Sequence, residues 1–340
     1  MTNLPMTDLP TTELLVIGAG LGGLACAADV QRAGEQVRVL DKARGVSGRA
    51  ATRRVTLPGE AGGEARLDHG ARFFTARSER LRQLAGALEL PVWALGFPTW
   101  EGGRITPEAG AHPRYVPADG LSALGKALAR GLDVRTGQTV TRLEKEGGGW
   151  TAHTAEGEAF RAARVVLNLP APQAAALASG VPELQGALAA VEYQPCWTVG
   201  AVLEADLPGA EWPALRVAGH PVIDWVAREH TKRPPGHPPA LIVQAHGEWS
   251  RAHLEAEKPT VEAALLAAVR EVTGTELRPR VTFAHRWRYA QPTRRVLAPH
   301  FWDAGHGLGA CGDGFTPDPH GSRVEAALLS GWSLGEALGG

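Results

Sequence analysis

Glycines and one acidic residue near the start of the chain have the spacing of a dinucleotide-binding turn. The apolar run 14–17 leads into the glycine-rich sequence 18–23, and a second apolar run, 37–40, ends at Asp41. Glycine permits a tight turn, close approach of the backbone to a pyrophosphate and close packing of helix on strand. Asp41 is expected to accept hydrogen bonds from the adenosine ribose. The turn residues predicted to contact the cofactor are Gly18, Gly20, Leu21, Gly22 and Gly23.

The sequence after Asp41 favours a flavin dinucleotide over a nicotinamide dinucleotide. Small residues fill 43–48, where a nicotinamide dehydrogenase normally continues into another helix. Gly48 admits close backbone approach, and the guanidinium of Arg49 can bind phosphate through two parallel hydrogen bonds. Lys42, Gly48 and Arg49 are therefore predicted cofactor residues.

Two features near the end of the chain suit the flavin end of such a cofactor. Gly312 and Asp313 follow a short apolar segment, and an acid there can bind a ribityl hydroxyl. Ser322 to Glu325 has the pattern of a capping box, so the following helix is expected to direct its N-terminal dipole at the flavin pyrimidine. Ser322 and Val324 are the predicted contacts. The alternative is a terminal helix that only packs on the sheet.

Six segments in order along nearly the whole chain resemble the renalase-like branch of the FAD-dependent amine-oxidase superfamily. They read VIGAGLGGLACA, VLDKARGVSGR, LDHGARFFTAR, YVPADGLSALGKALA, VVLNLPAPQ and CGDGF, of which the second and third are the specific ones. One departure is Ser47-Gly48-Arg49, where the superfamily usually has Gly-Gly-Arg. It puts one backbone contact in doubt, but not the arginine.

The resemblance implies the cofactor, its placement and an activity. It implies FAD, with Gly70 and Ala71 beside the isoalloxazine and Val140 in a strand that covers the adenine. Arg72 is placed for a substrate carboxamide or phosphate, or else forms a surface ion pair. His69 is expected to be structural. Cys311 precedes a strand end where small buried residues are expected, so the FAD is predicted to be noncovalent.

Members of this branch oxidise isomers of NAD(P)H, return NAD(P)+ and pass electrons to oxygen as hydrogen peroxide. One alternative is amine oxidation, in which superfamily members usually place a lysine near the flavin. No lysine of this chain lies on the strands expected above the flavin. A further alternative is a non-catalytic flavin-binding module. The partners expected are a dihydronicotinamide nucleotide or an amine, and oxygen.

A strand at 281–289 supplies the candidate substrate residues. It alternates strictly, so Phe283, His285, Trp287 and Tyr289 share one face while Arg286 and Arg288 share the other. With Arg72, the residues His285, Trp287 and Tyr289 are the catalytic candidates. The alternative is that this aromatic face belongs to the core.

Composition sets few further limits. The 340 residues carry a formal net charge of −1, so no field attracts nucleic acid or acidic membranes. The three cysteines have no paired spacing, which predicts a reducing compartment, namely the cytoplasm. No histidine pair has ligand spacing, so no metal is expected. Arg53-Arg54 is interpreted as solvated, and the oligomeric state stays open.

The predicted fold class is α/β, with an α+β substrate part. A Rossmann-type FAD-binding domain is expected over 10–85, 116–175 and 298–340, and a discontinuous, mostly antiparallel substrate domain over 86–115 and 176–297. A buried parallel strand is expected at 165–169. A helix is expected over 260–272, with Thr260 as its cap and Gly274 at its exit. Residues 231–239, with four prolines, are predicted to form a surface loop.

Overall fold

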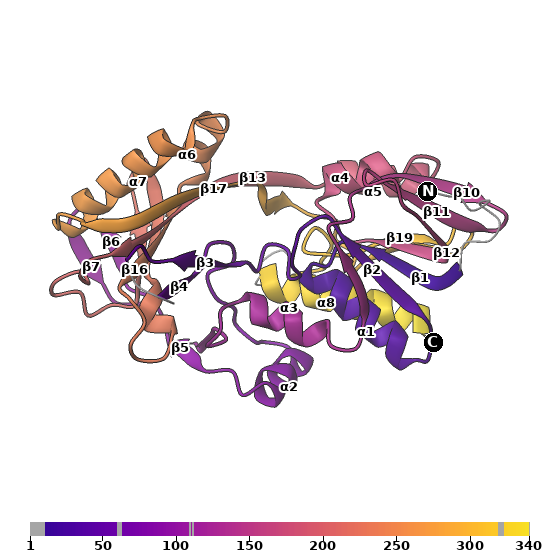
Figure 1. Ribbon diagram of the computed structural model, residues 1–340, viewed down its shortest axis with the longest axis horizontal. Helices are drawn as coiled ribbons and strands as arrows, with labels where there is room; N and C mark the ends of the chain where they lie inside the picture. Colours follow the sequence, from indigo (N-terminus) through magenta and orange to yellow (C-terminus); the bar gives the residue numbers. More distant parts are fainter. Residues whose placement is uncertain (1–10, 60–62, 109, 111, 319–322, 340) are drawn as a thin grey trace. The chain divides into compact units, whose positions relative to one another are not determined.

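The computed structural model describes residues 11–59, 63–108, 110, 112–318 and 323–339 (Figure 1). The chain forms two compact units, unit 1 from 1–50, 123–192 and 292–340, and unit 2 from 51–122 and 193–291. Unit 1 combines helices with a sheet, and unit 2 is rich in sheet, so the expected α/β fold class with an α+β part is confirmed. The bounds differ from the expected domains because 51–85 and 116–122 pack in unit 2, whereas 176–192 and 292–297 pack in unit 1.

Unit 1 is built on an eight-stranded sheet with a parallel centre. The path of neighbouring strands is β10-β11-β12-β1-β2-β9, and β19 and β18 extend it from β12. The pairs β12–β1, β1–β2, β2–β9 and β12–β19 are parallel. The bounds are β1 Thr11–Ile17, β2 Val37–Asp41, β9 Asp133–Thr136, β10 Val140–Glu146, β11 Gly149–Thr154, β12 Ala159–Leu167, β18 Phe301–Asp303 and β19 Leu308–Ala310.

Strand β12 is the centre of this sheet. One edge pairs with β1 over its length, and the other pairs with β11 at its start and with β19 at its end. Val165, Val166 and Leu167 are fully buried, as expected for a parallel strand covered on both faces. The strand ends at Leu167, two residues before the expected end.

Helices α1 (Leu21–Arg32) and α8 (Arg323–Gly339) cover one face of the sheet and lie along one another (Figure 1). Their apolar residues form one core with β1 and β2, including Leu14, Val39, Leu24 and Leu334. A Cβ added to Gly331 of α8 would lie 2.0 Å from the carbonyl oxygen of Gly22, so the two helices touch backbone to backbone. The other helices are α3 Ser122–Leu128, α4 Ala171–Leu177 and α5 Pro182–Ala189.

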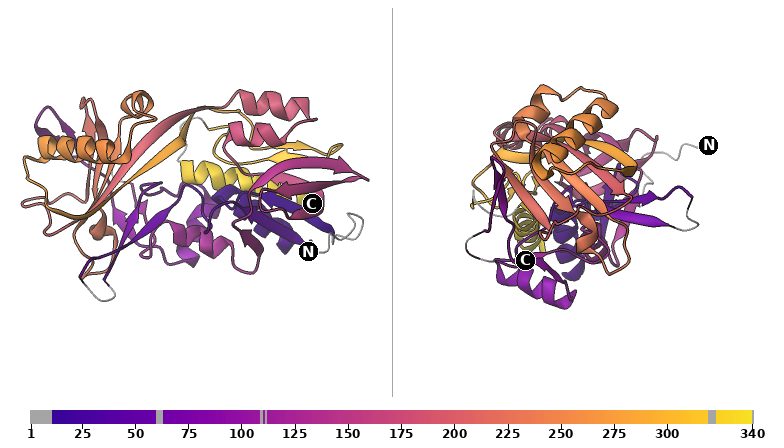
Figure 2. Two further views of the ribbon diagram at one scale, coloured as in Figure 1. Left: turned by 45° about the horizontal axis from the view of Figure 1, so that its top comes forward. Right: turned by 90° about the vertical axis from the view of Figure 1, so that its left-hand side faces the viewer.

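Unit 2 is built on a seven-stranded sheet of order β17-β13-β16-β15-β14-β6-β7. It is antiparallel apart from the β14–β6 pair, among the pairs whose register the described residues define. Figure 2 (right) shows these strands side by side with the orange helices on one side. The bounds are β6 Thr99–Glu101, β7 Arg104–Thr106, β13 Glu192–Leu203, β14 Ala214–Ala218, β15 Ile223–Arg228, β16 Ala240–Ala245 and β17 Pro279–Arg294.

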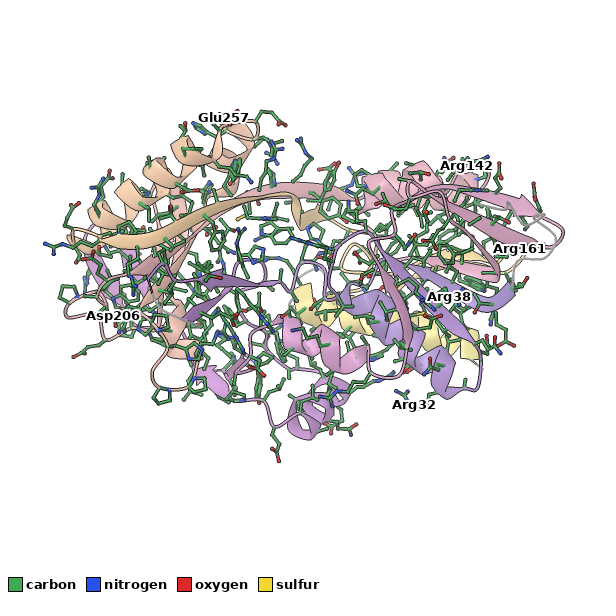
Figure 3. All side chains as sticks on the ribbon, in the orientation of Figure 1. Arg32, Arg38, Arg142, Arg161, Asp206 and Glu257 are labelled. Atoms are coloured by element: carbon green, nitrogen blue, oxygen red, sulfur yellow. The ribbon has the colours of Figure 1, made fainter. Side chains whose placement is uncertain are left out.

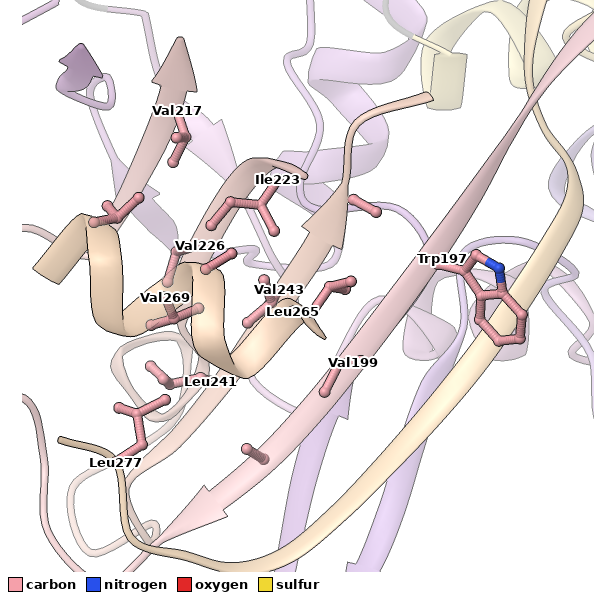
Figure 4. Packing of buried hydrophobic residues seen from close by; sticks show 14 of the residues in the cluster. Trp197, Val199, Val217, Ile223, Val226, Leu241, Val243, Leu265, Val269 and Leu277 are labelled. Carbon is pink, nitrogen blue, oxygen red and sulfur yellow. The ribbon is translucent and has the colours of Figure 1, made fainter. Parts of the chain in front are cut away.

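Alternate residues of β13 and β16 pack on opposite faces of this sheet. Val199 and Val243 pack under Leu265 of helix α7 (Figure 4). Val202 and Ile242 pack instead with the hairpin of β3 (Thr52–Thr56) and β4 (Glu64–Asp68). This burial on both faces explains why the hairpin belongs to unit 2. The remaining elements are α2 Glu79–Ala87, β5 Val92–Ala94, β8 Arg114–Tyr115, η2 Glu229–Lys232, α6 Gly247–Ala252 and α7 Lys258–Thr273.

Two local predictions in unit 2 need correction. Helix α7 begins at Lys258 with Glu257 as its cap, not Thr260, because Pro259 occupies the first turn, where its missing N–H costs nothing. Gly274 ends the helix in the left-handed conformation, as expected. Lys232 and Arg233 are buried, so the predicted surface loop is in part an interior segment held by ion pairs.

Within the described residues, no helix is both long and apolar enough to cross a membrane.

The contact between α1 and α8 gives a stability prediction. Gly331→Ala should lower the free energy of unfolding by about 1–3 kcal/mol, because the new methyl group collides with backbone rather than with a movable side chain. The control is Gly186→Ala in α5, where nothing lies within 4 Å, and it should stabilise by up to about 1 kcal/mol. Urea unfolding measures both. Equal effects would show that the helices do not touch at Gly331.

Candidate active site

The glycine turn between β1 and α1 is packed against Asn168, which directly follows β12. A Cβ added to Gly18 would lie 2.2 Å from the carbonyl oxygen of Asn168, and one on Gly20 would lie 2.6 Å from its Oδ1. One on Gly23 would lie 2.4 Å from the Gly18 carbonyl oxygen. Gly18 also has φ +106°, a conformation that favours glycine. The turn therefore presents bare backbone above the ends of the parallel strands, where dinucleotide phosphates bind.

Asn168 was not among the predicted site residues. Its backbone N–H donates to the Ile17 carbonyl over 2.8 Å, and its Nδ2 donates to the Cys311 carbonyl over 3.0 Å. One residue thus joins the ends of three strands beneath the turn, through its place after β12, its backbone N–H and its side chain. The available signal was a polar residue placed directly after a fully apolar run.

Asp41 is anchored to the turn by its own carboxylate. Its Oδ2 accepts the Ala19 N–H and its Oδ1 accepts the Ala43 N–H, each over 2.7 Å. Burial raises the pKa of this carboxyl, and the two backbone N–H groups partly oppose the rise. A carboxylate has about four acceptor positions, so two stay available for ribose hydroxyls.

The loop 45–49 lies directly beside the turn. Ser47 donates its backbone N–H to the Ala19 carbonyl over 2.7 Å, and Gly20 and Ser47 form a parallel bridge. Ser47 holds φ +93°, as the glycine usual at this position could do without strain. Its buried side chain fits because Gly125 of α3 lacks a Cβ, which would lie 2.6 Å from that of Ser47. The serine thus keeps the backbone path that the superfamily pattern implies.

Arg49 and Asp313 pair with each other. Nη2 of Arg49 lies 2.6 Å from Oδ1 of Asp313, which is 5% exposed. Gly312 precedes this acid at φ +134° and donates its N–H to Ser330 of α8. Two residues predicted at separate points of the cofactor therefore lie in one place.

The remaining predicted cofactor residues of unit 1 are less closely grouped. Leu21 and Gly22 are buried at the start of α1, Val324 is buried in α8, and Val140 begins β10 half-buried. Lys42 is exposed, with Nζ 3.4 Å from Oε1 of Gln173. Ser322 lies outside the described residues. These assignments stay predictions.

Burial makes Cys311 a poor nucleophile. It raises the pKa of the thiol to about 12, although a hydrogen bond from Asn168 opposes the rise. Because the thiolate is the reactive form, this cysteine is not suited to form a flavin thioether.

In unit 2, a buried set of four charges holds the start of the segment 68–72. Asp68 accepts hydrogen bonds from Thr52 Oγ1, the Leu121 N–H and Arg233 Nη2 at 2.6, 2.9 and 2.7 Å. Its burial opposes ionisation, but the charges of Lys232 and Arg233 outweigh it and lower the Asp68 pKa. The set is Asp68, Glu229, Lys232 and Arg233, two acids balanced by two bases.

Lys232 extends this set to Arg72. Its Nζ lies 2.5 Å from Oε1 of Glu229 and donates to the Arg72 carbonyl over 3.0 Å. The Arg72 guanidinium forms an ion pair with Asp224, as the ion-pair alternative expected, and it also bonds Gln244 and lies 4.7 Å from the centroid of the Trp225 ring. Gln244 also donates to the Gly70 carbonyl over 2.8 Å, so both ends of the Gly70-Ala71-Arg72 segment are fixed. The role of Arg72 toward a substrate stays a prediction.

The alternation predicted for 281–289 is confirmed by β17. Arg286 and Arg288 are exposed and pair with Glu255, while the aromatic residues are buried or half-buried. Trp287 stacks with His69 at 5.4 Å between ring centroids and donates its Nε1–H to the His69 carbonyl. We call His69, Phe283, His285 and Trp287 the aromatic cluster, since each ring contacts another within 6.0 Å.

Tyr289 contacts a ring outside the aromatic cluster. Its ring packs edge-on against Tyr193 at 5.6 Å between centroids. Whether these rings line a substrate site stays a prediction.

Comparison with known proteins defines the class of this chain. Residues 16–88 match the family described as an NAD(P)-binding Rossmann-like domain, and 101–333 match flavin containing amine oxidoreductase. Renalase of Mus musculus is 24% identical over 339 residues, covering 93% of this chain and 97% of that protein.

Two solved structures share the fold. Cyclohexylamine oxidase from Brevibacterium oxydans IH-35A has a TM-score of 0.76 at 13% identity, covering 97% of this chain and 99% of the other. Putrescine oxidase bound to putrescine has a TM-score of 0.71 at 15% identity, with the same coverage of 97% and 99%.

The chain belongs to the flavin-containing amine oxidoreductase family, because that match spans most of its length. It is an oxidoreductase, and its cofactor is FAD. The family, cofactor and enzyme class expected from the sequence are confirmed. Unit 1 fits the cofactor. The turn at Gly18, Gly20 and Gly23 has no room for a Cβ and so leaves its backbone open to phosphates, and Asp41 keeps acceptor positions for ribose. These residues and Arg49 would hold the dinucleotide.

Asp41→Ala should weaken FAD binding by about 2–4 kcal/mol, because it removes charge-assisted bonds to ribose and the anchors of the turn. The matched control is Asp133→Ala on the neighbouring strand β9, whose partner Arg38 is labelled in Figure 3. Flavin fluorescence quenching on the apoprotein measures both affinities. If the two variants bind FAD alike, Asp41 is not a cofactor residue.

His69 should make the protein sensitive to mild acid. Burial, followed by His285 and Arg53, lowers its pKa from 6.5 to about 4. The unfolded chain therefore takes up a proton near pH 6.5 that the folded protein refuses until about pH 4. Above pH 6.5 this difference in proton binding leaves the free energy of unfolding unchanged. As the pH falls to about 4.5, it lowers the free energy of unfolding by about 2–3 kcal/mol.

His69→Gln should reduce the difference in unfolding free energy between pH 7 and about 4.5 by that amount. His112→Gln, at an exposed histidine, is the control and should leave the difference unchanged. Urea unfolding at the two pH values provides the comparison. A His69 variant with the parent's pH dependence would contradict the lowered pKa.

Proposed function

We propose that this flavoenzyme oxidises isomers of NAD(P)H that carry the hydride at the wrong ring carbon. The products are NAD(P)+ and, with oxygen as the acceptor, hydrogen peroxide. The observation that carries the proposal is the charge around the aromatic cluster. The Arg53 guanidinium lies 4.5 Å from the centroid of the Phe283 ring, and the positive charges of Arg53 and Lys258 add to burial in lowering the His285 pKa. Such surroundings favour a neutral ring bearing phosphates over a protonated amine.

Oxidation of a dihydropyridine requires little acid–base catalysis by the protein. It is already a hydride donor, so orientation supplies most of the catalysis, and bound FAD supplies the two-electron acceptor. Trp287 and His285 offer ring faces to such a substrate. His285 is neutral at pH 7, since burial and Arg53 lower its pKa to about 4. Arg72 uses two of its five N–H groups on Gln244 and Asp224, which leaves donors for a carboxamide.

Amine oxidation is the alternative that the family name suggests. A lysine that holds water near the flavin is usual there, and the buried lysine of unit 2 is Lys232. Its Nζ lies 2.5 Å from Glu229 and 3.5 Å from Asp68, and it donates to the Arg72 carbonyl over 3.0 Å. This lysine is therefore committed to the buried charge set, which supports dihydropyridine oxidation over amine oxidation.

The surroundings of the cysteines support noncovalent FAD and a cytoplasmic location. All three thiols are buried, and burial raises the pKa of Cys26 and of Cys311. Unreactive thiols with no disulfide partner suit a reducing compartment.

Anaerobic titration of the purified yellow protein tests the proposal. Isomeric dihydro-NAD(P) should bleach the flavin within the mixing time of a manual experiment, whereas ordinary NAD(P)H and simple primary amines should not. Bleaching by an amine alone would establish amine oxidation, and a flavin that no reductant bleaches would establish a binding module. Release of FAD by heat or acid checks that it is noncovalent.

Arg72→Ala and Trp287→Ala should slow flavin reduction at least about threefold to tenfold, since a lost stacking or orienting contact costs about 0.5–1.5 kcal/mol. The flavin should stay bound. Arg288→Ala is the control, because Arg288 is exposed and pairs with Glu255. Anaerobic stopped-flow absorbance gives the rates. If Arg288→Ala slows flavin reduction and Trp287→Ala does not, the substrate lies on the other face of the strand.

A further inference from the structure

Arg53 lies over the edge of the aromatic cluster. It belongs to β3, its side chain is exposed, and its Cζ lies 4.5 Å from the centroid of the Phe283 ring. The sequence interpretation treated Arg53 and Arg54 alike as solvated arginines. The structure separates them, because Arg53 has an aromatic contact within the cluster.

Other arginines on β3, β4 and β17 are matched by acids. Arg54 and Arg66 share Glu64, with nitrogen–oxygen distances of 3.9 and 3.0 Å. Arg286 and Arg288 share Glu255 on the exposed face of β17. Within the described parts of the chain, no carboxylate pairs with Arg53. It is therefore a cation whose charge its neighbours leave uncompensated.

The charge of Arg53 acts on the cluster itself. Beside burial, it helps to lower the pKa of both His69 and His285 to about 4. The cluster thus combines neutral aromatic rings with one exposed guanidinium at their edge. A guanidinium binds phosphate through paired, charge-assisted hydrogen bonds, and it can do so while its carbon lies over an aromatic ring, as that of Arg53 lies over Phe283.

Arg72, the other candidate for a phosphate, is differently placed. Asp224 compensates the charge of Arg72, and Gln244 accepts a hydrogen bond from another N–H of its guanidinium. A neutralised guanidinium suits a carboxamide, whereas a dianionic or monoanionic phosphate gains more from an unpaired cation.

We propose that Arg53 binds a phosphate of the substrate and makes the enzyme selective for dihydronicotinamide nucleotides over uncharged dihydronicotinamides. This proposal rests on the proposed function, because it assigns the nucleotide part of the same substrate. It makes Arg53 a specificity residue that contributes to binding and not to the hydride step.

The test compares Arg53→Ala with Arg54→Ala, the next residue on the same strand. The reductants are an isomeric dihydronicotinamide mononucleotide and the uncharged 1-methyl-1,6-dihydronicotinamide, mixed anaerobically with the holoenzyme. Arg53→Ala should raise the half-saturating concentration of the nucleotide about tenfold and leave its limiting rate unchanged. Neither variant should change the kinetics of the methyl compound. Added salt should weaken nucleotide binding to the parent and to Arg54→Ala, but little in Arg53→Ala.

Equal losses with both reductants would mean that Arg53 only supports Phe283, and no loss with the nucleotide would also overturn the proposal. A second arm uses equilibrium binding of NAD+, followed by the flavin absorption spectrum. Arg53→Ala should weaken it about tenfold relative to Arg54→Ala. If neither dihydropyridine bleaches the parent enzyme, the proposed function fails, and this arm alone decides whether Arg53 binds phosphate.

Discussion

The close approach of the glycine turn to Asn168 is the constraint on which unit 1 depends. Asn168 bonds the end of β1 through its backbone and the segment after β19 through its side chain. The Gly18 N–H reaches the Leu40 carbonyl at the end of β2 over 2.7 Å. A side chain in the turn would therefore lift it from three strand ends at once. The start of α1, its contact with α8 and the cofactor cradle all follow from that packing.

Unit 2 depends on a different interaction, the buried ion pairs of two acids and two bases around Asp68. Each member is buried with its charge compensated, and removing one would leave a charge without a partner. The balance fixes the ends of the 68–72 segment through Thr52, Leu121 and the Arg72 carbonyl. The backbone of 68–72, which is predicted to run beside the flavin, is thus held in part by hydrogen bonds to buried charged side chains.

The sequence predicts features whose cause is local. The glycine turn, the alternation of 281–289 and the apolar run that became β12 each follow from spacing within one element. Pairings between distant segments have no such signal, and Arg49 and Asp313 are separated by 264 positions. The β3–β4 hairpin packs in unit 2, whereas the expected FAD-binding domain included it, because its pattern shows one apolar face but not which sheet covers it. Lys232 was placed in a surface loop because prolines follow it, while one of its two buried acids, Asp68, lies 164 positions away in the chain.

Cofactor binding and substrate selection place different demands on this fold. The phosphate-binding turn is made largely of backbone, so it accommodates Ser47, where the superfamily pattern implies glycine, because Gly125 leaves room for its side chain. That tolerance suits a fold shared by proteins only 13–24% identical to this one. Substrate selection has no such backbone basis, because it depends on the few side chains that reach the ligand. Under the proposed function, the two candidate arginines differ in their partners: Arg72 forms an ion pair with Asp224, whereas among the described residues no carboxylate pairs with Arg53, which lies against Phe283.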